Sequence, residues 1–454
     1  MLNISRYLPR RGTTLARLSR NIAWGLGSRG FNTVAGIVYL ALAARGLGPD
    51  LFGSFVLILT CGQMIANFVQ FQSWKGVIRY GALHLAADRP DRLGRLFGYT
   101  ATLDFGSALL GAAVAVIGAP IIAPLFNWSA DQQTSAALFG AVLLLSTGAT
   151  ATGMLRLFDR FDLIAYVEAV GPLIRLVGSV TAWIAGASVD TFLIIWATAA
   201  IAQAIAQWIA ALIVNRSPLK FGGSQFKQGG EENEGIFRFM LQSNVSNSVT
   251  TFWMQLGTLA VGAYAGAADA GAFRLAQRIA KGLVRPVRPI TQALYPELAR
   301  LVADDHHRKL RMMVVRATIA AAALGCTFVL VTGFAGREIL NIVAGKQFEF
   351  AYIFLTLFVV ATAIDLAGFA FEPFQDAHGR AGTVMRSKLV GAIAYTILIP
   401  ILMYWLGGVG AVIAAIVCSL LIFVQMARET WVILHRPQAE TVGDLGISEK
   451  SPTT

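Results

Sequence analysis

The chain has 454 residues, of which 56% are hydrophobic and 14% charged, and its mean hydropathy is +0.62. This composition is typical of an integral membrane protein and excludes an ordinary soluble enzyme. The net charge of +12 would suggest a nucleic-acid partner in a soluble protein. Because basic residues collect on the cytoplasmic side of membrane proteins, we expect no nucleic acid here.

Residues 1–20 form a basic, amphipathic segment that we place in the cytoplasm, because no signal-peptide cleavage site follows the first apolar run. The apolar runs that could cross a bilayer lie near 22–44, 52–72, 96–118, 135–155, 163–185, 190–214, 240–263, 269–297, 312–333, 350–373, 387–406 and 409–431. The sequence therefore predicts an all-α integral membrane protein with about 12 transmembrane helices.

Basic residues gather after every second run, whereas the alternate loops hold only Arg45, Arg337 and Lys346. By the positive-inside rule, both termini are cytoplasmic. The run at 269–297 carries five cations and three prolines, and a helix lying on the membrane surface is the alternative. If this run did not span, the basic cluster at 300–311 would lie outside and all later loops would invert, so we expect it to span.

The chain also divides into two similar halves. Three residues that follow the first helix of each half match at one constant offset: Gly48, Gly53 and Phe55 correspond to Gly266, Gly271 and Phe273. We therefore predict an N-lobe at 21–214 and a C-lobe at 239–432, as a parallel repeat related by an axis along the membrane normal. A cytoplasmic linker at 215–238 joins the lobes, and a disordered cytoplasmic tail occupies 433–454. A chance match in a Gly/Ala-rich chain is the alternative.

The eighth run carries a stripe of cations on one helix face. Steps of four, three, four and three residues separate Arg274, Arg278, Lys281, Arg285 and Arg288, which at about 100° per residue places them within a narrow arc. A charge at bilayer depth costs about 2.5–3.5 kcal/mol, so five of them will not face lipid. We expect them to line a water-filled cavity that also holds something anionic.

Other ionisable residues also fall within predicted spans. The cations are Arg29 in the first run and Arg175 in the fifth, and the acids are Asp104, Glu168, Asp365 and Glu372. Four acids cannot neutralise seven cations, so an excess of positive charge remains. The acids are candidates for charge pairing or for coupling to an ion. The alternatives are that they only hold helices together, or that Asp104 and Glu372 are hydrated near an interface. The seventh run is rich in Gln, Asn, Ser and Thr, which would bond another helix or line the cavity.

Two motifs carry a resemblance to a known family. At Arg45-Gly46-Leu47-Gly48-Pro49-Asp50-Leu51-Phe52-Gly53 and Leu294-Tyr295-Pro296-Glu297-Leu298-Ala299-Arg300 the chain resembles the polysaccharide transporter family. This is the oligosaccharide-lipid flippase branch of the multidrug/oligosaccharidyl-lipid/polysaccharide exporter superfamily. The resemblance implies two six-helix lobes that form a V around a central cationic cavity, with Arg29 and the stripe on cavity-lining helices. It also implies a polyprenyl-diphosphate-linked glycan as substrate.

These observations predict a flippase of a bacterial inner membrane that moves this lipid-linked oligosaccharide to the outer leaflet for cell-surface polysaccharide biosynthesis. Arg29, Arg175 and the stripe would bind the diphosphate. The expected partners are the glycan lipid, membrane lipids and other polysaccharide-assembly proteins. No metal or cofactor is expected, because Cys61, Cys326 and Cys418 stand singly.

Two other functions remain open. A multidrug antiporter of the same fold would want a net acidic cavity. A membrane glycosyltransferase or polymerase that uses a lipid diphosphate would want a catalytic external loop, yet the longest external segments, 119–134 and 334–349, hold no histidine. We therefore expect a transporter rather than an enzyme.

Overall fold

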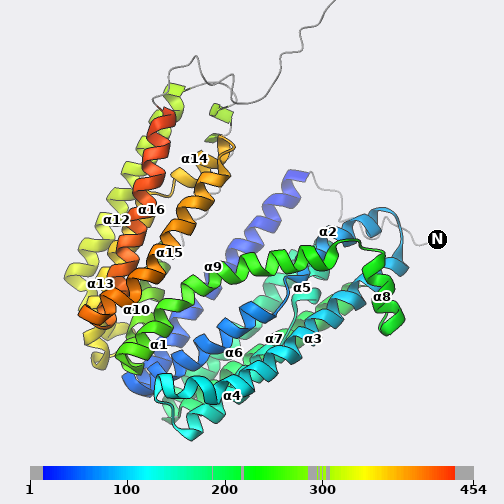
Figure 1. Cartoon of the computed structure of the whole chain (residues 1–454), viewed down its shortest axis with the longest axis horizontal. Coiled ribbons are helices and arrows are strands. Elements are labelled where there is room, and N and C mark those ends of the chain that lie inside the picture. Colours follow the sequence, from blue (N-terminus) through cyan, green and yellow to red (C-terminus); the bar gives the residue numbers. More distant parts are fainter. Residues whose placement is uncertain are drawn as a thin grey trace, which may run out of the picture. The chain divides into compact units, whose positions relative to one another are not determined.

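The computed structural model describes residues 14–186, 188–215, 219–284, 294, 297–298, 300–302 and 307–434. Within these residues every regular element is a helix (Figure 1). The α-helices of the first half are α1 (Thr14–Val69), α2 (Ser73–Ala86), α3 (Pro90–Ile122), α4 (Ala130–Leu145), α5 (Ala149–Leu157), α6 (Phe161–Ala185), α7 (Val189–Val214) and α8 (Gly223–Glu231). The second half holds α9 (Ile236–Ala265), α10 (Ala267–Val284), α12 (His307–Ala344), α13 (Tyr352–Ala367), α14 (Phe371–Ala377), α15 (Ala381–Leu406) and α16 (Gly408–Leu434). Short 3-10 helices occupy η2 (Ala123–Phe126) and η4 (Lys346–Ala351).

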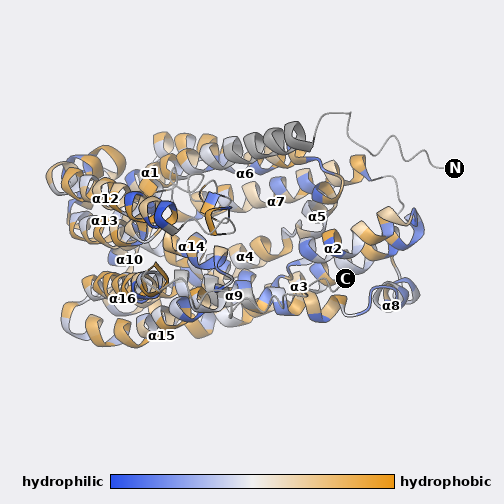
Figure 2. Ribbon diagram, turned by 90° about the horizontal axis from the view of Figure 1, so that it is seen from above, coloured by the Kyte–Doolittle hydropathy of each residue, from blue (hydrophilic) through white to orange (hydrophobic). Residues whose placement is uncertain are grey.

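Nine helical stretches of the described chain are long and apolar enough to cross a membrane. The first, Gly30–Ala86, has 57 residues and covers the first two predicted runs. The nine stretches therefore correspond to ten of the twelve predicted runs. The seventh run is helical as α9, and the eighth is helical as α10 as far as Val284, beyond which most of the run lies outside the described residues. Neither is among the nine stretches. Orange dominates the long helices in Figure 2, whereas α8 is bluer.

Glycine sets the main bend in α1. Gly48 has φ 73° and ψ 172° and precedes Pro49, so the helix breaks there and resumes. A residue with a side chain is disfavoured at such a positive φ. Gly266, between α9 and α10, has φ 96° and ψ 176°. The two matched glycines thus adopt nearly the same backbone conformation, although they lie 218 residues apart (266 − 48).

The order of the helices repeats as well. The pairs α4/α13, α5/α14, α6/α15 and α7/α16 begin 222, 222, 220 and 219 residues apart, from the starts 130/352, 149/371, 161/381 and 189/408. Helices α4 and α13 have 16 residues each, and α6 and α15 have 25 and 26. The internal repeat is therefore present in the backbone as well as in three sequence positions.

The chain divides into two compact units. Unit 1 comprises Met1–Arg278 and Glu338–Tyr352, and unit 2 comprises Ile279–Arg337 and Ile353–Thr454. The predicted lobes place their boundary in the linker at 215–238, whereas α9 packs against α1 inside unit 1. The division into two six-helix lobes stays a prediction.

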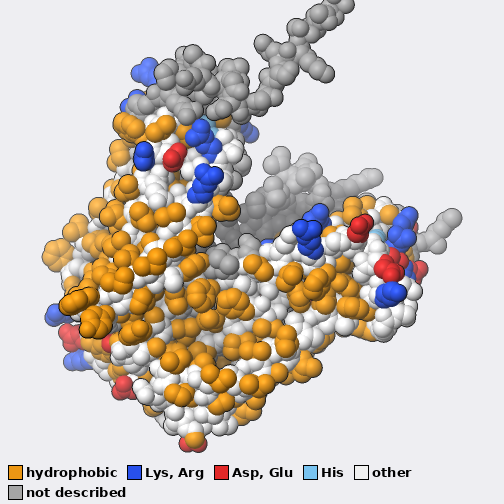
Figure 3. Space-filling view, in the orientation of Figure 1, with side chains coloured by type: hydrophobic (Ala, Val, Ile, Leu, Met, Phe, Trp, Pro, Cys, Tyr) orange, Lys and Arg blue, Asp and Glu red, His pale blue; other side chains and the backbone are white. Residues whose placement is uncertain are grey.

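Two features of unit 1 position its interior. Buried aromatic rings join α1 to α7: Trp196 meets Tyr39 and Phe55 edge to face, at centroid distances of 5.2 and 5.0 Å. Near the N-terminus of α3, an ion pair joins this helix to the segment that follows α8. The Arg95 guanidinium donates two hydrogen bonds to the Glu232 carboxylate, of 2.8 and 2.6 Å, and Figure 3 shows acidic and basic side chains gathered there.

Candidate functional site

The cationic cavity of unit 1

A polar cavity of about 60 Å³ lies within unit 1, between α1, α6, α7 and α10. It is lined by Tyr39, Leu40, Val56, Leu59, Thr60, Gln63, Arg175, Trp196, Arg274 and Arg278. Three of these residues are arginines, and the described lining contains no acidic side chain. Three of the predicted substrate-binding cations, from the fifth and eighth runs, are thus brought to one place.

Arg274 is held by amide side chains rather than by a carboxylate. Its Nη1 donates hydrogen bonds of 3.3 Å to the side-chain oxygens of Gln255 and Gln277. The Gln255 amide in turn donates to the side-chain oxygen of Gln63, at 3.2 Å. Because these partners are neutral, they orient the guanidinium without cancelling its charge.

Arg278 rests against α1. Its Nη2 donates to the Tyr39 hydroxyl at 3.3 Å, and its Cζ lies 5.7 Å from the Tyr39 ring centroid. Gly36 lies about one helical turn before Tyr39 on α1, and a Cβ built there would overlap the Arg278 Nη2. The guanidinium therefore occupies a place that only a glycine leaves open.

Arg175 approaches the cavity from α6. Its Cζ lies 5.8 Å from the Trp196 ring centroid and 6.0 Å from that of Tyr39, which are cation–π distances. Its Nε is buried and has no hydrogen-bond partner in the described part of the chain. A buried donor without an acceptor is costly, so this group is ready to donate to an anion.

Outcome for the other predicted residues

The remaining predicted cations do not all fall in described regions. The side chain of Arg29, and all of Arg285 and Arg288, lie outside the described residues. Lys281 continues the stripe along α10, but it belongs to unit 2. There it interacts electrostatically with Asp365, whose carboxylate also accepts a hydrogen bond from Ser419.

The predicted acids have partners of several kinds. Asp104 is buried and accepts hydrogen bonds from the Ser73 hydroxyl, the Thr150 amide at 2.9 Å and the Thr150 hydroxyl at 2.7 Å. These donors belong to the first turns of α2 and α5, so Asp104 joins two helix ends. Glu372 pairs with Lys388 at 2.6 Å, and Glu168 is half-buried on α6.

Three polar residues of the seventh run bond to another helix. The Asn244 amide donates to the backbone oxygen of Phe68 at 2.9 Å, and the Ser248 hydroxyl to that of Asn67 at 2.6 Å. Both contacts join α9 to α1. Gln255 alone of these three reaches the cavity network, through Gln63.

Four residues of the site were not singled out from the sequence: Gly36, Tyr39, Gln63 and Trp196. Tyr39 and Gly36 lie three residues apart on α1, and this spacing places them on one face. That signal is weak, because glycines and aromatic residues are common in membrane helices. Only the approach of Arg278 from α10 distinguishes them.

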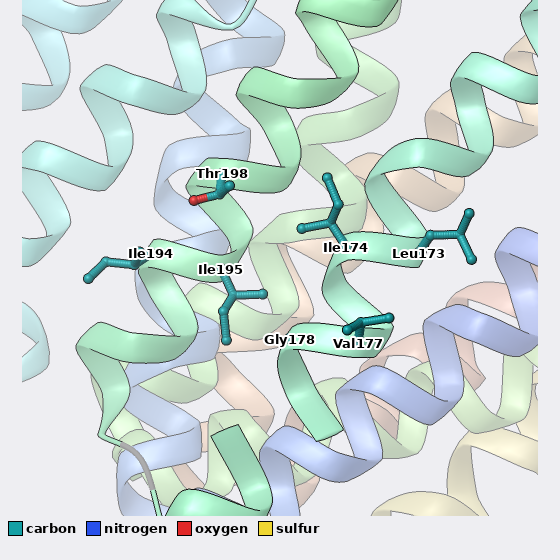
Figure 4. Close-up of a pocket in the computed structure, with 7 residues that line it drawn as sticks. All are labelled: Leu173, Ile174, Val177, Gly178, Ile194, Ile195 and Thr198. Carbon is teal, nitrogen blue, oxygen red and sulfur yellow. The ribbon is translucent and has the colours of Figure 1, made fainter. Parts of the chain in front are cut away.

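The other face of the α6–α7 pair is apolar. A groove of about 450 Å³ is lined by Leu173, Ile174, Val177, Gly178, Ile194, Ile195 and Thr198 (Figure 4). Val177 and Ile194 are 63% and 64% exposed, at the depth of candidate spans. Since Arg175 and Trp196 lie next to these residues in the chain but line the polar cavity, the helix pair presents opposite chemistry on its two faces.

Comparison with known proteins

Residues 18–302 match the family described as polysaccharide biosynthesis protein. This match spans more than half of the chain. The chain belongs to the polysaccharide biosynthesis protein family. It is 28% identical, over 342 residues, to "Inner membrane protein YghQ" of Escherichia coli (strain K12), a match that covers 73% of this chain and 94% of that protein.

A second relative is more distant. The chain is 22% identical over 185 residues to a Shigella dysenteriae protein named "Putative O-antigen transporter". This match covers 40% of the chain and 46% of that protein, so the chain spans about half the length of this relative.

Two solved structures of transporters share the fold of this family member. The lipid II flippase MurJ, in an inward closed conformation, aligns with a TM-score of 0.66 and 12% identity, over 93% of this chain and 89% of that one. A multidrug resistance MATE family transporter of the MOP superfamily, in an inward-facing conformation, aligns with a TM-score of 0.62 and 16% identity, over 92% and 98%. The chain is therefore an all-α membrane protein with the fold of these transporters.

Proposed function

We propose that this family member is an inner-membrane flippase that moves a polyprenyl-diphosphate-linked oligosaccharide from the inner to the outer leaflet by alternating access. The glycan would then enter cell-surface polysaccharide biosynthesis, in contact with membrane lipids and other polysaccharide-assembly proteins. The observation that carries the proposal is the cavity in which Arg175, Arg274 and Arg278 meet without an acid among the described lining residues.

A diphosphate suits this cavity. It offers several negatively charged acceptor oxygens, and a guanidinium can hold two of them at once through its planar fork. The buried Nε of Arg175 would gain the acceptor that it lacks in the described structure. Gln63, which also lines the cavity, offers a side-chain amide to a polar headgroup.

The size of the cavity supports a change of conformation during transport. About 60 Å³ has room for a few water molecules, since roughly 10–15 Å³ of such volume admits one. A glycan headgroup needs far more. We therefore infer that twelve helices in two six-helix lobes move against each other and open this cavity to one leaflet at a time.

The membrane potential can drive the step. Moving one negative charge outward across an inside-negative membrane yields roughly 2.3 kcal/mol per 100 mV. The acids Asp104, Glu168, Asp365 and Glu372 remain candidates for ion coupling, with Asp365 beside Lys281 and Glu372 beside Lys388.

The basic cavity weighs against the other two functions. Export of cationic drugs needs an acidic cavity, although the fold of a multidrug transporter aligns well. A glycosyltransferase or polymerase needs a general base or nucleophile near the diphosphate. The described lining offers Tyr39 and Thr60 and no carboxylate or histidine.

The proposal is tested by transfer of a fluorescent polyprenyl-diphosphate sugar between leaflets of liposomes that contain the purified protein, with and without an inside-negative potential. We expect protein-dependent transfer that the potential accelerates. Arg175→Ala and Arg278→Ala should each lower the rate by about 10–100-fold, the value of one lost charge-assisted contact.

The matched control is Lys309→Ala, which removes an exposed cation of α12 that is not among the residues lining the cavity. This variant should keep the wild-type rate. If folded wild-type protein transfers no substrate under any gradient, the flippase proposal is rejected, and the antiporter and the enzyme become the remaining candidates.

A further inference from the structure

The geometry around Arg278 points to a role for a residue that carries no functional group. Gly36 is buried on α1, and the three atoms nearest to a Cβ built there all belong to the Arg278 guanidinium: Nη2, Cζ and Nε. Cζ and Nε would lie 3.0 and 3.4 Å from that Cβ, and Nη2 would overlap it. Gly36 is therefore a notch in α1 that fits this one side chain.

Tyr39 forms the second wall of the notch. Its hydroxyl accepts the hydrogen bond from Arg278 Nη2 at 3.3 Å, and its ring lies under the guanidinium. Tyr39 is itself fixed, because Trp196 packs edge to face against it. The position of Arg278 is thus set by α1 backbone on one side and by a braced ring on the other.

We propose that Gly36 is a specificity-determining residue. By admitting the guanidinium close to α1, it sets the position of Arg278 in the cavity that Arg175 and Arg274 also line, where a ligand with two linked phosphates can contact more of the three cations than a single phosphate can. The inference rests on the proposed function, since it assumes that the three arginines bind the headgroup. An added methyl group at position 36 moves the guanidinium and weakens this multiple contact, whereas a single phosphate needs only one or two of the cations.

The fold should accept Gly36→Ala for two reasons. The clash is with the end of a flexible side chain, so the helix can accept the methyl group. Alanine also favours helix over glycine, so the fold should tolerate the change. Gly30→Ala is the matched control, because it makes the same change on the same helix where nothing lies within 4 Å of the new Cβ.

The experiment measures binding of undecaprenyl diphosphate and undecaprenyl monophosphate to the full-length protein in nanodiscs. For Gly36→Ala we expect about tenfold weaker binding of the diphosphate and at most about twofold weaker binding of the monophosphate, because a bidentate charged contact is lost. Gly30→Ala should change neither affinity.

A double-mutant cycle decides whether the effect passes through Arg278. Arg278→Lys removes the fork that fills the notch, so Gly36→Ala should weaken diphosphate binding no further in that background. Equal loss in both backgrounds, equal loss for both ligands, or no loss at all would overturn the role of Gly36. If Arg278→Ala itself leaves diphosphate binding unchanged, the proposed function fails together with this inference. Weaker binding by Arg278→Ala with normal binding by Gly36→Ala rejects only the notch.

Discussion

At the scale of single residues, ionisable groups at membrane depth have two distinct fates. Arg175, Arg274 and Arg278 meet neutral partners and keep their charge available. Asp104 instead accepts hydrogen bonds on both of its carboxylate oxygens. The sequence could not distinguish a buried structural Asp from a cavity Arg, because each is simply a charged residue within an apolar run.

Asp104 should therefore matter for stability. Asp104→Ala leaves the Ser73 hydroxyl and both Thr150 donors unsatisfied in a buried place, which should cost about 2–4 kcal/mol. Asp104→Asn keeps an acceptor for Thr150 and should cost less. Thermal unfolding in detergent measures both, with the exposed Asp50→Ala as control. If Asp104→Ala melts with the wild type, the network contributes no stability.

At the scale of elements, the predicted linker contains the helix α8, which is fastened to α3. The Arg95 hydrogen bonds lower the pKa of Glu232 below its ordinary value, with burial acting in the opposite direction. A carboxyl whose pKa is lowered by folding stabilises the folded state above its unfolded pKa, and this stabilisation is lost as pH falls through the folded pKa. The contact should therefore be present at neutral pH and vanish in the acid range below about 4.

This pH dependence can be measured on Glu232→Gln. Near pH 7 the variant should be about 1–2 kcal/mol less stable than the wild type, because a partly buried, doubly hydrogen-bonded ion pair is lost. The difference should shrink as the pH falls below 4. Lys227→Ala removes a pair that is 79% and 65% exposed and should cost no more than about 0.5 kcal/mol. A pH-independent difference would assign the effect of Glu232→Gln to packing instead.

The elements themselves were largely predictable. Long apolar runs correspond to helices because a chain in lipid must satisfy its own backbone hydrogen bonds. The predicted run 52–72 ends close to the end of α1, but the separate helix α2 after it was not predicted. The break at 146–148, which begins α5, lies inside the predicted run 135–155 and was also missed. Neither break, at 70–72 or at 146–148, contains a proline, and the helices that follow them both donate hydrogen bonds to the distant carboxylate of Asp104, through Ser73 and Thr150. Likewise, periodicity placed the stripe on one face of α10 but could not show that Gly36 and Tyr39 receive one of its members.

At the scale of the whole molecule, the two halves of the repeat are joined between the bend of α1 at Gly48 and the C-terminal end of α12. The Arg45 side chain donates hydrogen bonds to the backbone oxygens of Asn341, Ile342 and Val343. The Gln347 side-chain amide donates a hydrogen bond to the Ala44 backbone oxygen at 3.3 Å. A cation is favourable at a helix C-terminus, where carbonyl groups lack partners. Arg45, the first residue of the first family motif, thus caps the C-terminal end of α12, a helix of the other half.

Arg45→Ala should loosen that closure. The loss of these contacts, about 1–2 kcal/mol, should speed amide hydrogen exchange of residues 341–348 by about 5–30-fold. Lys346→Ala is the control, because it removes an exposed cation of the same segment. Unchanged exchange in Arg45→Ala would show that the segment is held by other contacts, such as the edge-to-face rings of Phe52 and Phe348.

The matched glycines of the repeat also touch. A Cβ at Gly271 would lie 3.0 Å from the Gly53 Cα, and a Cβ at Gly53 would overlap the backbone of Ala267. A half-length protein with this motif would meet an identical twin in the same way, as equal patches meet in a twofold dimer. In such a dimer, any single mutation would strike both sides of the contact at once. In this single chain the two glycines are separate positions, so a substitution at Gly53 or at Gly271 changes only one side of the contact.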